Sequence, residues 1–291
     1  MDIMDKIKSG IYGLNPLMDG GFNKNSTTVI IGPSGAGKTT FATQFLRKGL
    51  ELMNPGVFIS LDENKEQIIK EAVEMGWGNI HKYLDEKLLL FIDASGKKFA
   101  QFIREDLPDF IQKWEGANAR IVIDPLTPVM WSIKDKYEQR ELLSFLLKET
   151  RRIGTVVCTL EEHGSEPDLS GPEVVIPMYL ADSVIHLRYE LLGEMEKRAL
   201  KIVKCRSSRH SKFLHNYKII RGLGLMIQRH PQELKCTNEI PRKLKKELEK
   251  KLKLPKREYD EFMNNLDFLI DDDFSGMNYR DIANNILKEF E

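Results

Sequence analysis

Apolar residues in the first part of the chain form two patterns that alternate. Solid apolar runs, rich in β-branched residues, predict buried strands at residues 27–31, 56–61, 88–93, 120–124 and 155–160. Apolar residues at helical spacing predict helices at residues 38–52, 66–75, 99–114 and 140–152, the third with a break near Pro108. Strands that alternate with helices and are apolar on both faces are typical of a mainly parallel central sheet with helices on both faces. The pattern therefore predicts an α/β fold.

A different pattern occupies residues 180–227. Four short runs, at residues 183–189, 199–204, 215–220 and 224–228, have strand character and no long helix between them. We expect these runs to form antiparallel strands that close one edge of the sheet.

The composition changes beyond residue 230. Residues 242–257 hold nine basic side chains, and residues 258–291 hold ten acidic ones. Three apolar stripes at helical spacing run through this segment, beginning at Leu244, Tyr259 and Tyr279. Because such stripes need burial, we expect a docked helical segment there. The predicted organisation is one α/β domain at residues 1–230 and a helical C-terminal extension at residues 231–291.

The overall composition limits the cellular compartments and partners that we expect for this chain. The chain has 291 residues and a formal net charge of zero, so no global field attracts it to nucleic acid or to a membrane. The N-terminal residues lack the apolar stretch of a signal peptide, and no apolar run approaches the roughly 20 residues of a bilayer span. We therefore expect a cytoplasmic protein without membrane contact. The three cysteines, Cys158, Cys205 and Cys236, are far apart, which favours free thiols over a disulfide or a zinc site.

A glycine-rich loop joins the first predicted strand to the first predicted helix. Its residues are Gly32, Pro33, Ser34, Gly35, Ala36, Gly37, Lys38 and Thr39, and Thr40 follows directly. This is the spacing of a phosphate loop, in which glycines let backbone N–H groups turn toward the phosphates of a nucleoside triphosphate. The helix adds its positive end, and Lys38 adds a charge on the β- and γ-phosphates. The sequence thus predicts a triphosphate site at residues 32–40, against the alternative of a plain glycine-rich turn.

A magnesium site is predicted beside this loop. The Thr39 hydroxyl is the group that ligates magnesium at this position of a phosphate loop. Asp124 ends the apolar strand at residues 120–124, which has the form of a Walker B strand, and its carboxylate can hold a magnesium-bound water. An aspartate at a strand end is common, so this assignment depends on the loop that precedes it.

Hydrolysis also needs a group that orients the attacking water. Pro125 follows Asp124, which excludes a glutamate directly after the Walker aspartate. Asp62 and Glu63 follow the strand at residues 56–61, and in a parallel sheet that strand ends at the same crevice as the phosphate loop. We assign Glu63 as the base, with Asp62 beside it. An exposed loop acid or a helix N-cap is the alternative that spacing leaves open.

Further motifs accompany the loop in a fixed order. They are the lead-in at residues 9–22, the paired acids Asp62-Glu63, the segment at residues 122–127, the late strand at residues 181–187 and the Lys-x-Arg segment at residues 204–211. Together with the loop, they resemble the KaiC-like ATPases of the RecA superfamily over residues 7–228. Several ordered motifs are more specific than any one of them.

The resemblance implies a single RecA-like domain that binds ATP with Mg²⁺ and hydrolyses it. It also implies a homo-oligomeric ring, usually a hexamer, in which ATP lies between neighbouring subunits. In that family the Lys-x-Arg segment reaches the γ-phosphate in the neighbour's site. Carried over, Lys204 and Arg206 would act in trans and stabilise charge in the transition state. A solvated basic hairpin is the alternative.

Three departures from the family pattern matter. Asp62 stands where the family usually has a glutamate, and its side chain is one methylene shorter, which predicts slow turnover. Ser207 stands where the family often has glycine. The chain has a single phosphate loop, unlike the double-domain members, and nothing in residues 231–291 resembles their phosphorylation segment, so autokinase activity is not expected.

The leading functional hypothesis is a slow ATPase whose nucleotide state switches a ring between conformations that a protein partner reads. The second is a RecA/RadA-like DNA-binding recombinase paralogue. Residues 161–177 speak against it, because this polar stretch carries five acids and no lysine or arginine, whereas phosphate contacts need basic groups. Residues 242–257 are basic, but their leucine stripe favours a packed helix with a solvated face, so nucleic acid is not the favoured partner.

Two further hypotheses stay open. A small-molecule or nucleotide kinase also uses a phosphate loop, but such an enzyme usually needs an arginine-rich lid, which the sequence does not show. An ATP-binding regulatory module that never hydrolyses ATP is the non-enzymatic alternative. Product analysis and the effect of Glu63→Gln on phosphate release separate these hypotheses from the ATPase.

Overall fold

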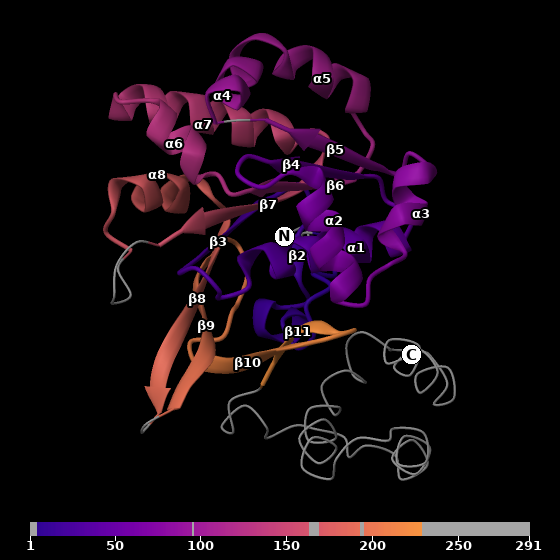
Figure 1. Cartoon of the computed structure of the whole chain (residues 1–291). Coiled ribbons are helices and arrows are strands. Elements are labelled where there is room, and N and C mark those ends of the chain that lie inside the picture. The colour runs from indigo at the N-terminus through magenta and orange to yellow at the C-terminus, as the bar shows by residue number, and fades with distance from the viewer. Residues whose placement is uncertain (1–4, 95, 163–168, 193–194, 229–291) are drawn as a thin grey trace.

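The computed structural model of the chain describes residues 5–94, 96–162, 169–192 and 195–228. It is an α/β structure around a nine-stranded sheet, accompanied by a small sheet of β1 (Lys6–Ile7) and β2 (Phe22–Asn23) (Figure 1). The strands of the main sheet are β3 (Thr27–Gly32), β4 (Gly56–Ser60), β5 (Leu89–Asp93), β6 (Ala119–Asp124), β7 (Gly154–Glu161), β8 (Ser183–Leu192), β9 (Met195–Cys205), β10 (Leu214–Ile220) and β11 (Gly224–Ile227). Their spatial order is β11-β10-β9-β8-β3-β7-β6-β4-β5. The helices predicted within residues 231–291 lie outside the described residues.

The sheet is parallel at one end and antiparallel at the other. Strands β8, β3, β7, β6, β4 and β5 pair in parallel, which confirms the predicted central sheet. The antiparallel part begins where β9 pairs with β8, and it continues through β10 and β11. The four late strands are therefore antiparallel to one another, as expected, and β8 also pairs in parallel with β3. A helix that the sequence pattern did not predict, α8 (Pro172–Leu180), supplies the crossover that a parallel β8 requires.

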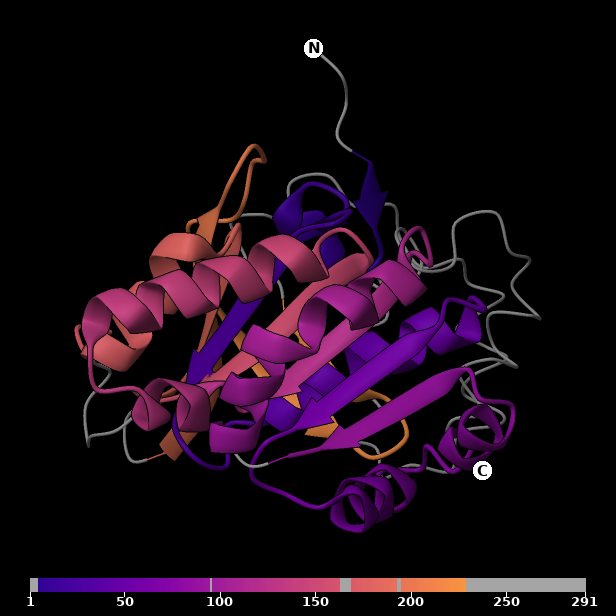
Figure 2. The same cartoon turned by 90° about the horizontal axis from the view of Figure 1, so that it is seen from above.

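Helices cover both faces of the sheet. Helices α1 (Lys38–Glu51), α2 (Lys65–Glu74) and α3 (Ile80–Asp85) pack on one face. The other face carries α4 (Gly96–Glu105), α5 (Leu107–Trp114), α6 (Thr127–Ser132), α7 (Lys136–Thr150) and α8. Figure 2 shows α7 lying over the strands on this second face. The helix expected at residues 99–114 is interrupted between α4 and α5, as the proline near its centre predicts.

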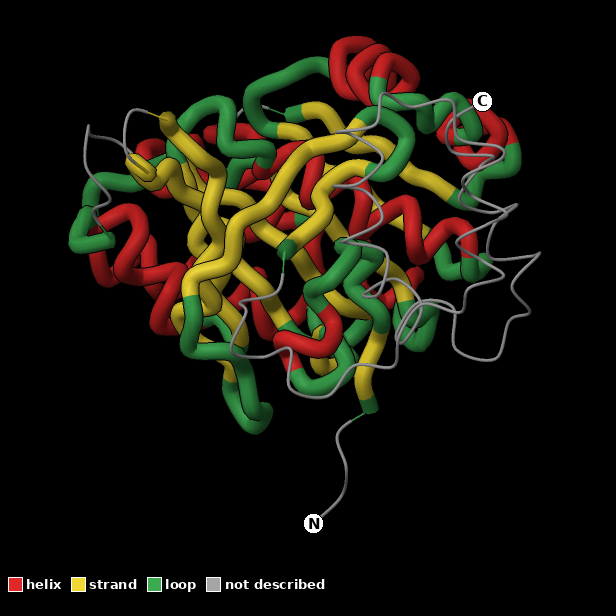
Figure 3. Tube along the Cα trace, turned by 90° about the horizontal axis from the view of Figure 1, so that it is seen from below, coloured by secondary structure: helices red, strands yellow, loops and turns green. Residues whose placement is uncertain are grey.

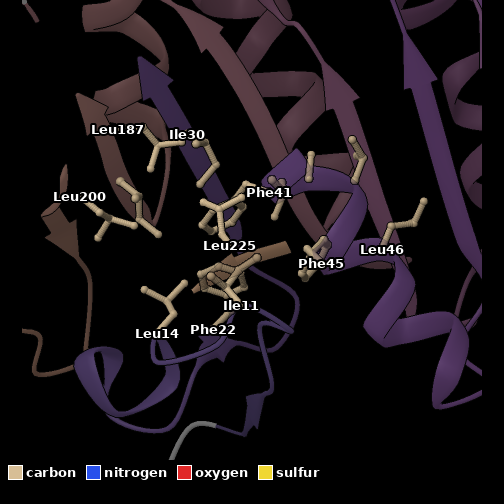
Figure 4. Packing of buried hydrophobic residues seen from close by; sticks show 14 of the residues in the cluster. Ile11, Leu14, Phe22, Ile30, Phe41, Phe45, Leu46, Leu187, Leu200 and Leu225 are labelled. Atoms are coloured by element: carbon tan, nitrogen blue, oxygen red, sulfur yellow. The ribbon is translucent and has the colours of Figure 1, made fainter. Parts of the chain in front are cut away.

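The core beneath α1 joins segments that are distant in sequence. Figure 4 shows side chains from the lead-in, from α1, from β3 and from strands β8, β9 and β11 in one apolar cluster. The lead-in contributes Phe22, whose ring packs edge-on against Phe45 of α1 with a centroid separation of 5.7 Å. A short 3-10 helix, η1 (Asn15–Met18), brings two more lead-in side chains into the same core. This packing fixes where the N-terminus of α1 points.

The antiparallel end of the sheet curls around α1. Helix α1 contacts β6 and β7 on its sheet side and β11 on another side. Figure 3 shows the molecule from below, with its helices, strands and loops in different colours. No helix within the described parts of the chain combines the length and the apolarity that a bilayer span requires.

Candidate functional site

The candidate site lies at the carboxyl ends of the parallel strands. Because β3, β4, β6 and β7 run in the same direction, the segments that follow them meet at one edge of the sheet. A cavity of about 370 Å³ opens there. It is lined by Ser34, Gly35, Gly37, Lys38, Thr39, Thr40, Asp62, Glu63, Glu71, Asp124, Pro125, Glu161 and Ile219. The structure thus brings the predicted loop, the paired acids and the Walker B aspartate into one cavity.

The glycine-rich loop has the backbone conformation that its composition predicts. Gly35 and Gly37 have φ values of 76° and 92°, a region that favours glycine. A Cβ atom on Gly32 would lie 2.4 Å from the Leu187 carbonyl oxygen, so the first glycine is required for close strand packing. Helix α1 begins directly at Lys38, and its unpaired N–H groups therefore point toward the cavity.

Lys38 is the basic group of the cavity. Its Nζ atom donates a hydrogen bond to the Pro33 carbonyl oxygen at 3.0 Å, across the loop. Burial lowers the pKa of Lys38, and the charges of Glu161 and Asp124 act in the opposite direction. These carboxylates favour the charged form of the amine, which is the form that phosphate binding requires.

Asp124 is buried at the end of β6, next to the predicted magnesium ligand Thr39. Its carboxylate accepts hydrogen bonds from the hydroxyls of Thr159 and Thr39. Burial raises the pKa of Asp124, whereas the two hydroxyls and Lys38 lower it. The peptide bond between Asp124 and Pro125 is cis.

This donor set fits a magnesium ion. Magnesium in triphosphate sites takes one or two protein oxygens and completes its shell with water and phosphate. Thr39 and Asp124 supply such oxygens beside the loop. In the described residues, no group of three or more histidine, cysteine or carboxylate side chains could hold a metal ion.

Asp62 and Glu63 lie on the rim of the cavity, after β4. The N-cap alternative is excluded for Asp62, because Asn64 caps α2 by accepting a hydrogen bond from the Gln67 N–H at 2.9 Å. Desolvation raises the pKa of Glu63, and the negative charges of Glu71, Asp124 and Asp62 raise it further. A carboxylate with a raised pKa is a better proton acceptor, which suits the base proposed from the sequence.

The cavity also holds residues that sequence reasoning missed. Glu71 of α2 and Glu161 at the end of β7 line it, as does Ile219 of β10. The position of Glu161 in the cavity could have been predicted, because this residue ends a parallel strand at the same edge of the sheet. Glu71 lies in the middle of a helix, and no sequence pattern predicts that it lines the cavity. With them, the lining contains five carboxylates against the single amine of Lys38. A bound triphosphate would add further negative charge, so the site needs cations from outside this set.

A second cavity of about 320 Å³ adjoins the first. The two share Thr39, Thr40, Glu71 and Ile219. Away from the shared residues, the second cavity is lined mainly by Thr43, Ile68, Ala72, Glu74, Met75, Trp77 and Arg221. It therefore has an apolar wall and one arginine, next to the N-terminus of α1.

The structure does not bring Lys204 and Arg206 to this cavity. Lys204 pairs with Val184 near the start of β8, and Val184 is level with Val29 on β3. Val29 lies three residues before Gly32, so this position is about 10 Å from Gly32 along the sheet, at roughly 3.3 Å per residue. Lys204 Nζ donates to the carbonyl oxygens of Met178, Tyr179 and Ala181 at 2.8, 3.1 and 2.6 Å, and Arg206 donates to that of Tyr179 at 2.9 Å. Both residues thus lie at the carboxyl end of α8, away from their own phosphate loop.

A buried contact between a carboxylate and an imidazole lies behind the loop. The side chains of Glu162 and His186 are each 3% exposed, and their Oε2 and Nε2 atoms are 2.9 Å apart. The Glu162 N–H donates to the Gly32 carbonyl oxygen at 3.1 Å, so this residue is tied to both β8 and the loop. Glu162 of the polar stretch at residues 161–177 is therefore buried, and the residues from Pro172 onward already belong to α8. Glu166 and Asp168 lie outside the described residues.

Comparisons with known proteins agree with this geometry. A family model described as "ATPase: KaiC" matches residues 7–232. The circadian clock oscillator proteins KaiC of Thermostichus vulcanus and Synechococcus elongatus are 31% and 33% identical, over 76% and 71% of this chain and 44% and 41% of their own. The chain thus spans less than half the length of these curated relatives. The crystal structure of a KaiC-like protein from Pyrococcus horikoshii matches 78% of this chain and all of its own, with a TM-score of 0.64 and 29% identity. The chain belongs to the KaiC family of ATPases.

Proposed function

We propose that this chain is a magnesium-dependent ATPase whose catalytic site is completed by a neighbouring copy of the same chain. One observation carries the proposal: a single cavity collects Lys38, Asp124 and Glu63 from segments that follow three different parallel strands. Phosphate binding, metal binding and water activation each need one of these residue types. Their convergence supports hydrolysis over simple nucleotide storage.

The two adjoining cavities accommodate the two parts of the nucleotide. The triphosphate lies along residues 32–40, where Lys38 and the N-terminus of α1 offset its charge. The nucleoside lies in the second cavity, whose apolar wall includes Ile68 and Met75. Thr39 and Asp124 hold the magnesium ion, which offsets phosphate charge and orients the γ-phosphate when bound.

Glu63 accepts the proton of the attacking water in this proposal. The neighbouring acids that raise its pKa also make it a stronger base. Asp62 lies beside it on the cavity rim and is too short to replace it, which makes turnover slow. The product is ADP and inorganic phosphate, without transfer to a protein side chain.

Lys204 and Arg206 of a neighbouring copy supply the missing positive charge. Five carboxylates surround one lysine in the cavity of a single chain, so a second source of cations is needed for a triphosphate. Lys204 and Arg206 lie away from their own loop, where a head-to-tail contact can present them to the next subunit. Such a heterologous contact closes into a ring, for which we propose six subunits.

The wider role that we propose is a nucleotide-dependent switch in the cytoplasm. ATP binding and hydrolysis change the contacts between neighbouring subunits, and a protein partner reads the difference. We also propose a division of the chain into an ATPase domain at residues 1–230 and an extension at residues 231–291, which the end of the family match at residue 232 supports.

A hydrolysis assay tests this proposal. Purified protein is incubated with radiolabelled ATP and Mg²⁺, with Lys38→Ala as the control and chelation of the metal as a second arm. Release of phosphate that requires both Lys38 and Mg²⁺ supports the proposal, and turnover that survives Lys38→Ala overturns it. The mass in solution with and without ATP tests the ring, since a strict monomer under both conditions contradicts a shared site.

A further inference from the structure

The phosphate loop is held from outside by the antiparallel strands. Tyr217 of β10 is 3% exposed, and its hydroxyl donates a hydrogen bond of 2.6 Å to the Ala36 carbonyl oxygen. Burial raises the pKa of the Tyr217 phenol above its ordinary value, so the hydroxyl keeps its proton and remains a donor. Tyr217 lies 181 residues from Ala36 in the sequence, so only the fold brings the two residues together.

The contact sets the direction of a neighbouring N–H group. A peptide unit is planar and trans, so the Ala36 carbonyl and the Gly37 N–H point in opposite directions. A carbonyl that is drawn outward toward Tyr217 therefore turns the Gly37 N–H toward the inner side of the loop. Gly37 has a φ of 92° and no Cβ atom, so its backbone is permissive and the hydrogen bond from Tyr217 helps to fix the orientation of this peptide.

Other side chains of strands β8, β9 and β10 lie close to the same part of the loop, residues 35–37. A Cβ atom on Gly37 would lie 2.5 Å from Ile219 Cδ1, and one on Gly35 would lie 3.1 Å from the Tyr189 hydroxyl. Arg198 of β9 donates to the Gly35 carbonyl oxygen at 3.4 Å. Strands β8, β9 and β10 thus form a wall against residues 35–37, and the bond from Tyr217 is the shortest polar contact in that wall.

We propose that Tyr217 is a positioning residue for nucleotide binding, which fixes the Ala36–Gly37 peptide so that the Gly37 N–H faces the phosphates. This inference rests on the proposed function, in which the loop binds a nucleoside triphosphate. Without the hydroxyl, the peptide samples other orientations, and a bound nucleotide must restore the productive one. Affinity therefore falls, whereas turnover at saturating ATP stays almost the same.

The test is Tyr217→Phe, which removes one oxygen atom and keeps the ring. Dissociation constants for Mg-ADP and for a non-hydrolysable ATP analogue with Mg²⁺ are measured by calorimetry, and turnover is measured at saturating ATP. We expect both dissociation constants to rise about tenfold, the effect of losing one buried hydrogen bond, and saturated turnover to change by less than about twofold. Tyr83→Phe is the matched control, because Tyr83 is a buried tyrosine of the same core cluster whose hydroxyl interacts with Asn79, away from the loop.

The outcomes separate this inference from the function on which it rests. Lys38→Ala should abolish binding in the same assay, and an unchanged affinity there overturns the proposed function together with this inference. If Lys38→Ala abolishes binding but Tyr217→Phe binds as tightly as the wild type, only the inference fails. A thermal melt completes the test: a loss of stability in Tyr217→Phe without loss of affinity shows a purely structural tyrosine and also overturns it.

Discussion

Two lysines, Lys38 and Lys204, show how the parallel and antiparallel regions of the sheet differ. Burial lowers the pKa of both. Lys38 lies among carboxylates that favour its charge, and a single carbonyl of its own loop accepts its hydrogen bond. Arg206 and Arg151 disfavour the charge of Lys204, Asp182 favours it, and three carbonyls at the end of α8 accept its hydrogen bonds. The parallel region therefore concentrates negative charge around one amine, whereas Lys204 and Arg206 place two basic groups elsewhere in the chain.

The carboxylates around Lys38 and the basic groups Lys204 and Arg206 are complementary in charge, but they are separated within one chain. Strand β9 carries Lys204 at the end that lies beside the start of β8, whereas the phosphate loop follows the opposite end of β3. No rearrangement within a parallel sheet brings these ends together, because strand direction fixes which ends meet. A second copy is the simplest source of the missing cations, and this makes the comparison testable by mutation.

The largest effect is expected from Arg206→Ala. An arginine that stabilises transition-state charge contributes about 10³-fold or more to turnover in phosphate-transfer enzymes, so saturated ATP turnover should fall by about 10³-fold. The fold should persist, because the side chain is exposed and its hydrogen bond to Tyr179 lies at a helix end. The measurement is phosphate release by the variant and the wild type at equal concentration.

Mixing variants shows whether Arg206 acts in trans. Arg206→Ala and Lys38→Ala subunits are each inactive alone, but an intact loop can meet an intact arginine in a mixed ring. Random mixing in equal amounts should restore about a quarter of wild-type activity, the fraction of interfaces with both groups. Two inactive variants that stay inactive after subunit exchange would remove the shared site from the proposal.

The next effect, on stability, lies at the junction of the two regions. Glu162 follows parallel β7 and pairs with His186, which lies on the strand that joins the parallel and antiparallel parts. Removing one partner of a buried pair leaves the other without compensation, so Glu162→Ala should lower the free energy of unfolding by about 3 kcal/mol in urea titrations. Glu138→Ala is the control, because the Arg104–Glu138 pair is about half exposed and water screens it. Equal losses in the two variants would contradict a structural role for the buried pair.

The sequence predicted the parallel region well, because its strands are solid apolar runs bounded by loop residues. The strand expected at residues 56–61 is β4 (Gly56–Ser60), and the loop, Asp124 and Glu63 meet in one cavity as expected. Helix ends were less accurate. Helix α7 begins four residues earlier than predicted, at Lys136, because the Asp135 side chain caps it while its first turn is exposed and carries no apolar stripe.

The antiparallel region and the contacts between regions could not be predicted in the same way. The direction of β8 depends on α8, whose hydrophobic residues are spread around the helix and give no clear stripe. Glu162 reads as one acid in a polar run, and only the fold shows that His186, 24 residues later, covers it. Tyr217 has a strand pattern that predicts burial, but no pattern predicts that its hydroxyl reaches Ala36.

The smallest effect concerns the acid limb of the pH–rate profile. A general base works only when ionised, and the pKa of Glu63 is raised, so kcat/KM should fall on acidification at a higher pH than for an ordinary glutamate. Glu71 is the largest charge that raises this pKa. Glu71→Gln removes that charge and favours ionised Glu63, so the acid limb should move to lower pH.

Two variants decide whether Glu63 is the group that titrates. Glu66→Gln, an exposed change on the same helix as Glu71, should leave the limb in place. Burial also raises the pKa of Asp124, so the limb could belong to that carboxylate instead. Glu63→Gln distinguishes between the two carboxylates. If Glu63 is the base, the slow hydrolysis that remains in this variant should lose its acid limb. An acid limb that persists in Glu63→Gln would transfer the titration to Asp124 and contradict the assignment of Glu63 as the base.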